Sequence, residues 1–314
     1  MTAHTLTWPH GTFKILPTAA ILAEGHFLLN GTPFAPFARA PWLGDDLAPA
    51  ITGHLRVLGG DFPCLPFGIG RNMTTTAPDW SAVLKGPTQG PIHGPAAEQD
   101  WTVTDATDSA ISLTLTYPED SPVHHVQRTI TARPNAPALD FTFTIHARRK
   151  TQISAGLHPI LRLPDQPGRL HLQAQFQFGL THPAYGAKPF QTLAEIGLDH
   201  VPLHPRRDLN AQLCGITTPL HAIYVDEHAG LTLDWDRRLL PSLQIWHTDR
   251  GIPGPPWHNA YRGIGVEPIA SAFDLHTDVS TAPNPISARG VATCLHIDPA
   301  KPTTLRHSIT AFST

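Results

Sequence analysis

The sequence is poor in cysteine and in charge, and it has no long apolar run. Its 314 residues include three cysteines, Cys64, Cys214 and Cys294, whose wide spacing and odd number predict reduced thiols in a cytoplasmic protein rather than a disulfide framework. Charged residues make up 15% of the chain, and the longest basic cluster, 148–150, is too short to indicate nucleic-acid binding. Because no stretch approaches about 18 consecutive apolar residues and the first residues lack the pattern of a signal peptide, we expect no membrane-spanning segment.

Sequence motifs for metals and cofactors are also missing. The 20 histidines include no HExxH pair, and no Cys-x-x-Cys accompanies them, so we expect no metal site. The segment 68–70 lacks the third glycine of a dinucleotide fingerprint, and neither a GxxxxGK[ST] phosphate loop nor a GxSxG elbow is present. These absences predict a protein that needs no cofactor, in which histidine, carboxylate and arginine side chains carry any chemistry.

What the sequence does contain is a repeated alternation of apolar and polar residues. The alternation is strict at 111–117, 139–145 and 170–178, and a period of two predicts strands that turn one face to a core. Turn-forming residues at 105–109 and 133–137 separate neighbouring strands. Further strands are predicted at 101–104, 126–131, 231–235, 242–247, 293–297 and 304–312, and short helical turns near 45–58 and 191–198.

This pattern predicts an all-β protein formed by one large antiparallel β-sandwich of roughly 20 strands. The 33 prolines and 24 glycines are spread over the whole chain, as expected for many short elements joined by turns. No break in composition marks a domain boundary, and no repeat of fixed period suggests a propeller. We therefore expect a single domain over residues 1–314.

Four segments, in order along the chain, carry a resemblance to a known family. They are 59–71, where a Pro-Phe stretch leads to Arg71; 92–94, which contains His93 and is followed by Trp101; 156–159, which contains His158; and 261–268, which contains Glu267. The ordered set resembles the aldose 1-epimerase (galactose mutarotase) superfamily over residues 55–312. The resemblance implies a large twisted β-sandwich that binds a sugar on a concave face. It also implies an enzyme that interconverts the α and β anomers of a monosaccharide without a cofactor.

The resemblance implies roles for individual residues as well. Glu267 is expected to be the base that takes the proton of the C1 hydroxyl and His158 the acid that protonates the ring oxygen, because opening a hemiacetal ring needs both groups on one pocket. Arg71 and His93 are expected to bind the sugar oxygens. Trp246 is expected to offer its ring to the C–H surface of the sugar, unless it belongs to the core.

The chain departs from the family pattern in four places. Residues 68–70 stand between Phe67 and Arg71 in the arginine segment, and no asparagine precedes His158. Pro95 follows the His-Gly pair, where galactose mutarotases commonly have a small residue or glycine. The substrate-binding aspartate of the family has no clear counterpart, and Asp199 and Asp208 are both candidates for it. These differences concern the identity of the sugar more than the type of reaction.

Other functions fit parts of the same pattern. Glu267 could be a structural carboxylate paired with Arg262 or Arg71. A sugar-binding protein without catalysis would keep the pocket but would not need an acid–base pair. A mutarotase for sugar phosphates would need a further basic cluster, for which 206–207 and 237–238 are candidates. A glycoside hydrolase is disfavoured because no closely placed second carboxylate is evident.

Overall fold

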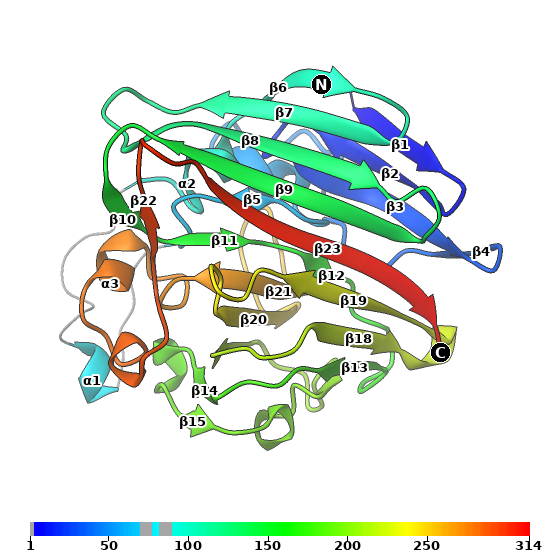
Figure 1. Ribbon diagram of the computed structural model, residues 1–314. Coiled ribbons are helices and arrows are strands. Elements are labelled where there is room, and N and C mark those ends of the chain that lie inside the picture. Colours follow the sequence, from blue (N-terminus) through cyan, green and yellow to red (C-terminus); the bar gives the residue numbers. More distant parts are fainter. Residues whose placement is uncertain (1–2, 70–76, 82–89) are drawn as a thin grey trace.

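The computed structural model describes residues 3–69, 77–81 and 90–314, and there it confirms an all-β protein made of large antiparallel sheets. The largest sheet has nine strands, which lie side by side in Figure 1 from β6 at the top of the view to β13 near the bottom. In order across the sheet they are β16 (His200–Val201), β13 (Leu170–Gln173), β18 (Leu220–Tyr224), β19 (Ala229–Trp235), β23 (Thr303–Ser313), β9 (Ala138–Ala147), β8 (Val123–Ala132), β7 (Ala110–Thr116) and β6 (Thr102–Ala106).

A second sheet has eight strands and forms the other layer of the sandwich. It consists of β15 (Pro189–Phe190), β14 (Phe178–Thr181), β17 (Leu209–Cys214), β20 (Ser242–Asp249), β21 (Arg262–Ala270), β11 (Ala155–Leu157) and β5 (Pro63–Cys64), with β12 (Ile160–Leu161) also paired to β21. Phe141 and Ile309 of the nine-stranded sheet belong to the same buried hydrophobic cluster as Ile245 and Val266 of the eight-stranded sheet. The two sheets therefore share one core.

Smaller elements complete the structure. A four-stranded sheet contains β1 (His4–Trp8), β2 (Gly11–Leu16), β3 (Ile21–Leu29) and β4 (Thr32–Phe34), and β10 (Thr151–Ile153) pairs with β22 (Leu295–Ile297). The described helices are short: α1 (Pro78–Ser81), α2 (Gly94–Glu98) and α3 (Thr277–Thr281), with the 3-10 turns η1 (Gly53–Val57), η2 (Pro183–Tyr185), η3 (Leu193–Ile196), η4 (Val225–Glu227) and η5 (Ser287–Arg289). Within the described ranges no helix has the length and apolar character to cross a bilayer.

The strands β20 and β21 have two chemically different faces. Ile245 and Val266 lie opposite each other in the ladder and point into the shared core. The neighbouring pair, Gln244 opposite Glu267, therefore points to the other side of the sheet, since successive side chains alternate between faces. Gln212 of β17 lies opposite Gln244 and extends this row. The outer face of the eight-stranded sheet thus carries buried polar groups in its centre.

Most of the strands predicted from alternation are confirmed. The segments 111–117 and 139–145 correspond to β7 and β9, and four others lie inside longer strands: 126–131 in β8, 231–235 in β19, 242–247 in β20 and 304–312 in β23. The segments 101–104 and 293–297 overlap β6 and β22. The predicted helical turns contain η1 and η3.

The prediction of one strand over 170–178 is wrong. The chain forms β13 in the nine-stranded sheet and then β14 in the eight-stranded sheet, with residues 174–177 crossing between them. The alternation of apolar and polar residues continues through the crossing because both parts border the same core. Leu170 and Leu172 of β13 point to the core between the two sheets, and Ala174 and Phe176 of the crossing segment pack against it. The alternation did not predict β1 to β5, β10 to β12, β15 to β18 or β21. The ladder between β2 and β3 has a register shift between Phe13 and Ile15.

A buried group of charges joins two strands of the nine-stranded sheet to the segment before β5 of the eight-stranded sheet. The carboxylate of Asp61 accepts hydrogen bonds from Arg128 of β8 and, at 3.1 Å, from Nε2 of His307 of β23. Burial opposes ionisation of Asp61, but His307 and Arg128 outweigh it and lower the pKa of the carboxyl. The main chain of Asp61 also bridges to Leu22 of β3. Asp61 therefore ties the N-terminal sheet to the sandwich.

We predict that Arg128→Met destabilises the protein by about 3–5 kcal/mol, because it leaves a carboxylate buried beside a single remaining partner. The measurement is the free energy of unfolding in urea. Arg133→Met, which removes an exposed partner of Asp140, serves as the control and should cost less than about 1 kcal/mol. Equal losses in the two variants would contradict the role of the buried group.

Candidate active site

A cavity of about 230 Å³ lies over the polar face of β20 and β21. Ligand pockets for drug-sized molecules are about 300–1,000 Å³, so this cavity has room for a ligand smaller than these. The two strands contribute Gln244, Trp246 and Glu267 to its lining. The rest comes from η1 and from loops: His54, Leu55, Leu58, Ile69, Ile92, His93, His158, Ile252, Trp257 and Asp274.

Glu267 lies at the floor of the cavity and is buried. Neither of its carboxyl oxygens has a hydrogen-bond partner. Gly265, two residues earlier on β21, makes room for it, because a Cβ atom there would lie 2.1 Å from Glu267 Oε1. Burial, and to a smaller extent the charge of Asp274, raise the pKa of Glu267 well above its usual value. The structure therefore favours the protonated carboxyl.

His158 follows β11 and faces Glu267 across the cavity. Its ring stacks on Phe62, with centroids 4.6 Å apart and planes inclined by 17°, and its main-chain N–H donates to the carbonyl of Phe62. These contacts place Nε2 3.5 Å from Glu267 Oε1. Burial, with a smaller effect of His54, lowers the pKa of His158 to about 3. The imidazole is therefore neutral near pH 7, and the pair as a whole carries one exchangeable proton.

His93 closes another side of the cavity from the turn that precedes α2. Its Nδ1 accepts a hydrogen bond from the main-chain N–H of Gly68 at 3.4 Å, so the ring proton is assigned to Nε2. The ring lies edge-on to His158, with centroids 5.0 Å apart. Burial lowers the pKa of His93 well below its usual value, which makes it a neutral hydrogen-bond donor.

Trp246 is half-buried and belongs both to the cavity wall and to an aromatic group. Its ring stacks on Tyr261 with an inclination of 18° and lies edge-on to His158 at 6.0 Å between centroids. Trp257 packs edge-on against it and also lines the cavity. Trp246 therefore packs against a buried hydrophobic cluster and also forms part of the cavity wall.

The structure also resolves alternatives for other predicted residues. Arg262 binds Asp249 at 2.8 Å and Asp165 at 2.9 Å, so it does not pair with Glu267. Asp199 binds His200, and Asp208 accepts hydrogen bonds from Thr248 and the main chain of Asp249; neither lines the cavity. Arg71 lies outside the described residues.

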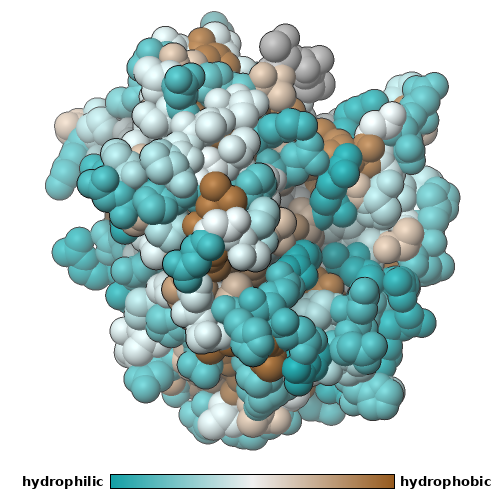
Figure 2. Space-filling view, turned by 90° about the vertical axis from the view of Figure 1, so that its right-hand side faces the viewer, coloured by the Kyte–Doolittle hydropathy of each residue, from teal (hydrophilic) through white to brown (hydrophobic). Residues whose placement is uncertain are grey.

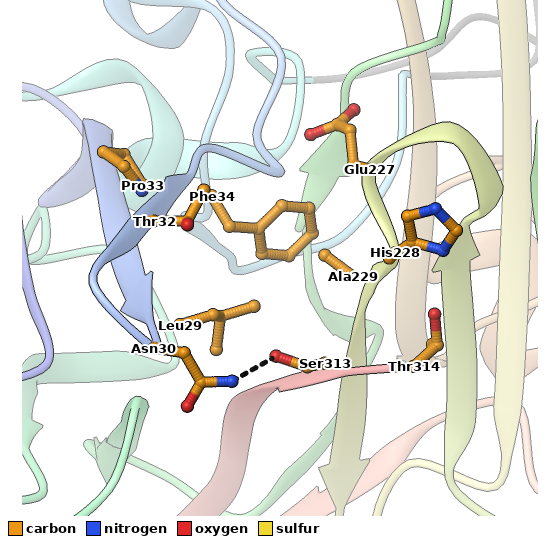
Figure 3. A pocket seen from close by; sticks show the side chains of 10 residues that line it. All are labelled: Leu29, Asn30, Thr32, Pro33, Phe34, Glu227, His228, Ala229, Ser313 and Thr314. Carbon is orange, nitrogen blue, oxygen red and sulfur yellow. Dashed lines mark hydrogen bonds between the residues drawn. The ribbon is translucent and has the colours of Figure 1, made fainter.

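A second hollow, of about 350 Å³, lies between β3, β4 and the C-terminal residues (Figure 3). It contains Glu227 and His228, but the carboxylate of Glu227 is bound by Arg162. Asn30 and Ser313 are joined across it by a hydrogen bond of 3.3 Å. Figure 2 shows the face of the molecule to which this end belongs as largely hydrophilic, with small scattered hydrophobic groups. The hollow offers no convergent acid–base pair, so the cavity at Glu267 is the better candidate.

Comparisons with known proteins agree with this architecture. No family model and no curated protein matches the sequence. Solved structures do match the fold. An Escherichia coli K12 protein provisionally assigned as an aldose 1-epimerase matches with a TM-score of 0.67 and 16% identity, over 100% of this chain and 99% of the other. The Slr1438 protein of Synechocystis has a TM-score of 0.70 and 12% identity, over 100% of this chain and 96% of its own, and a C. elegans GalM/aldose epimerase homologue has a TM-score of 0.65 and 14% identity, over 100% of both chains. The chain has the galactose mutarotase-like fold.

The galactose mutarotase-like fold confirms the resemblance seen in the sequence, at the level of architecture. The matches extend over 100% of this chain, so they include β1 to β4, which precede the segment in which the motifs were found. Four polar or aromatic residues of the cavity were not predicted from the sequence. They are His54, Gln244, Trp257 and Asp274. Gln244 alone could have been found, because it lies two residues from Trp246 and must share its face.

Among the described residues of this mutarotase-like fold, no group of three or more His, Cys, Asp or Glu side chains is arranged to hold a metal ion. The cavity does bring together side chains that can take up and release a proton. The nearest pair able to exchange a proton there is His158 and Glu267.

We predict that Glu267→Gln makes the protein more stable than the wild type, increasingly so as the pH rises above about 4.5. Above that pH the unfolded chain releases the proton of Glu267 while the folded protein retains it, so the free energy of unfolding of the wild type falls until the raised pKa is reached. Glutamine does not titrate and avoids this loss. Thermal unfolding of both proteins from pH 4 to 8 measures the difference, and a difference that shrinks with pH would contradict the raised pKa.

We also predict that Gly265→Ala moves the carboxyl group of Glu267 without unfolding the protein, because the added methyl group meets the free end of that side chain. A crystal structure of the variant would show the shift. Gly263→Ala on the same strand is the control, since its methyl group would meet Ile160 and Tyr261 instead. A carboxyl group found in its original position in Gly265→Ala would disprove the prediction.

Proposed function

We propose that this protein is an aldose 1-epimerase that interconverts the anomers of an uncharged monosaccharide. The observation that carries the proposal is the distance of 3.5 Å between Nε2 of His158 and Oε1 of Glu267 in one cavity. A protein that only binds sugars gains nothing from two titratable groups whose pKa values are shifted in opposite directions by burial.

The proposed reaction uses the one proton that the pair shares. With the proton on His158, Glu267 takes the proton of the C1 hydroxyl while His158 protonates the ring oxygen, and the C1–O5 bond breaks to give the open-chain aldehyde. After rotation about C1–C2, the two groups reverse their roles: Glu267 returns a proton to the carbonyl oxygen as the ring oxygen attacks and gives its proton to His158. The number of protons on the pair is the same before and after.

In the sugar-free protein the pKa directions place the shared proton on Glu267. A sugar changes this balance, because hydroxyl groups that donate hydrogen bonds to a carboxylate stabilise its charged form. The oxygens of Glu267 have no partner within the protein and are free to accept such bonds. Sugar binding is therefore expected to shift the proton to His158, which prepares Glu267 as the base.

The lining of the cavity favours an uncharged sugar over a sugar phosphate as the ligand. None of the described lining residues is arginine or lysine. Of the basic clusters considered from the sequence, Arg237 binds Asp234 and Arg238 binds Asp236, and neither they nor Arg206 and Arg207 line the cavity. The neutral hydrogen-bond donor His93 and the aromatic ring of Trp246 in the cavity wall suit a sugar ring with hydroxyl groups.

We predict that Glu267→Gln and His158→Asn each lower the rate of anomer exchange by about 10²–10⁴-fold, since each removes one partner of the proton transfer. Polarimetry or NMR saturation transfer on several freshly dissolved sugars measures the rate, and isothermal titration measures binding. Glu227→Gln and His228→Asn, in the second hollow, are the matched controls and should leave the rate unchanged. Wild-type protein that binds a sugar without accelerating exchange would favour the sugar-binding alternative and refute the enzyme.

A further inference from the structure

A buried histidine and a carboxylate behind it form a pair beside the cavity that the proposed reaction does not use. His54 of η1 lines the cavity, and its side chain is 3% exposed. Its Nδ1 lies 3.0 Å from Oε1 of Glu98, the last residue of α2, whose side chain is 15% exposed. Glu98 itself does not line the cavity. The pair therefore has its imidazole at the cavity wall and its carboxylate behind that wall.

The surrounding residues fix the position and the charge of Glu98. The hydroxyl group of Thr52 donates to Oε2 at 2.8 Å. Gly53 lets η1 approach α2 closely, because a Cβ atom there would lie 2.5 Å from Cα of Glu98 and 2.7 Å from its Oε2. Burial opposes the ionisation of Glu98, but His54 and Thr52 outweigh it and lower the pKa of the carboxyl. The carboxylate is therefore charged near pH 7, and it faces the imidazole of His54.

Ring contacts connect His54 to the acid of the proposed reaction. The centroid of His54 lies 5.1 Å from that of Phe62, the ring on which His158 also stacks. His54 lies edge-on to His93 at 5.5 Å, and His93 lies edge-on to His158 at 5.0 Å. The three imidazole rings are thus close enough that a positive charge on one of them opposes the protonation of the other two.

The charge of His54 acts on its two histidine neighbours. After burial, it is a cause of the low pKa of His158, and together with burial and His158 it lowers the pKa of His93. The raised pKa of Glu267 has other causes, namely burial and the charge of Asp274. A charge on His54 therefore affects the acid of the proposed reaction more than its base.

We propose that Glu98 is a positioning residue for His158: it keeps His54 cationic at the cavity wall, and this charge sets the range of pH in which His158 can act as the acid. The proposal rests on the proposed function. The cation disfavours a second positive charge on His158, so the one proton of the acid–base pair stays on Glu267 until a sugar binds. The titratable or charged residues of the elements around His54 and His158 are Glu98, His93, Glu267, Asp274 and, on η1 itself, Arg56.

The first test needs no sugar. Ring ¹⁵N NMR follows the protonation of His54 and His158 in wild type and in Glu98→Gln from about pH 4 to 8. In wild type near pH 7, His54 should carry protons on both ring nitrogens, whereas in Glu98→Gln it should be neutral. The protonation curve of His158 should then move to higher pH by about 0.5–1.5 units, the effect of removing one nearby charge.

A double-mutant cycle shows whether Glu98 acts through His54. His54→Asn should move the protonation curve of His158 in the same direction as Glu98→Gln does. In the His54→Asn background, Glu98→Gln should change this curve little, because the cation through which Glu98 acts is already absent. Glu98→Asp, which keeps the carboxylate, should restore most of the wild-type behaviour.

The second test is the pH profile of kcat/KM for anomer exchange. The reaction needs one proton on the pair of His158 and Glu267, and a second proton on His158 blocks it. A raised pKa of His158 in Glu98→Gln therefore moves the acidic limb of the profile to higher pH. The limb governed by Glu267 should stay in place. Glu227→Gln, whose carboxylate is bound by Arg162 away from the cavity, is the control and should move neither limb.

The outcomes distinguish this proposal from the proposed function. A neutral His54 in wild type near pH 7 would overturn the role of Glu98. An unmoved protonation curve of His158 in Glu98→Gln would do so as well, and so would an equal loss of rate at every pH, which indicates a structural role. Wild type that shows the expected protonation states but exchanges no anomers would overturn the epimerase, while the effect of Glu98 on His158 would stand.

Discussion

A carboxyl group buried without a hydrogen-bond partner is the feature on which the site depends. An unsatisfied buried polar group costs about 1–3 kcal/mol, and the protein must offset this cost elsewhere. It does so with the apolar face of the same strands, where Ile245 and Val266 belong to a core shared by two large sheets. The carboxyl group of Glu267 consequently remains available to a ligand and to His158.

The position of His158 depends on a contact with the segment that anchors the sheets. Phe62 stacks on the imidazole ring, and the residue before it, Asp61, is bound by Arg128 and His307 in the core. A shift of Asp61 would therefore move Phe62, the next residue in the chain, and with it the imidazole ring of His158 that stacks on Phe62. The buried charges stabilise the fold and also help to hold His158 at its distance from Glu267.

The cavity contains two carboxyl groups whose pKa values are shifted in opposite directions. Glu267 lies where burial favours its protonated form, whereas Asp274 has a histidine and an amide behind it and stays charged. The difference comes from the presence or absence of hydrogen-bond donors within the protein. In this one cavity burial favours the protonated form of Glu267, whereas hydrogen-bond donors of the protein favour the ionised form of Asp274.

The sequence by itself determined the class of fold, most strands of the nine-stranded sheet, and the segments that carry His158, His93, Trp246 and Glu267, because a period of two and short motifs are local properties of the chain. It did not determine where residues 170–178 cross from one sheet to the other, since both sheets border the same core and the alternation does not change. Nor did it reveal Asp274, whose partner His182 lies 92 positions away. That contact exists because β14, β17 and β21 belong to one sheet, and tertiary structure alone decides which strands are neighbours.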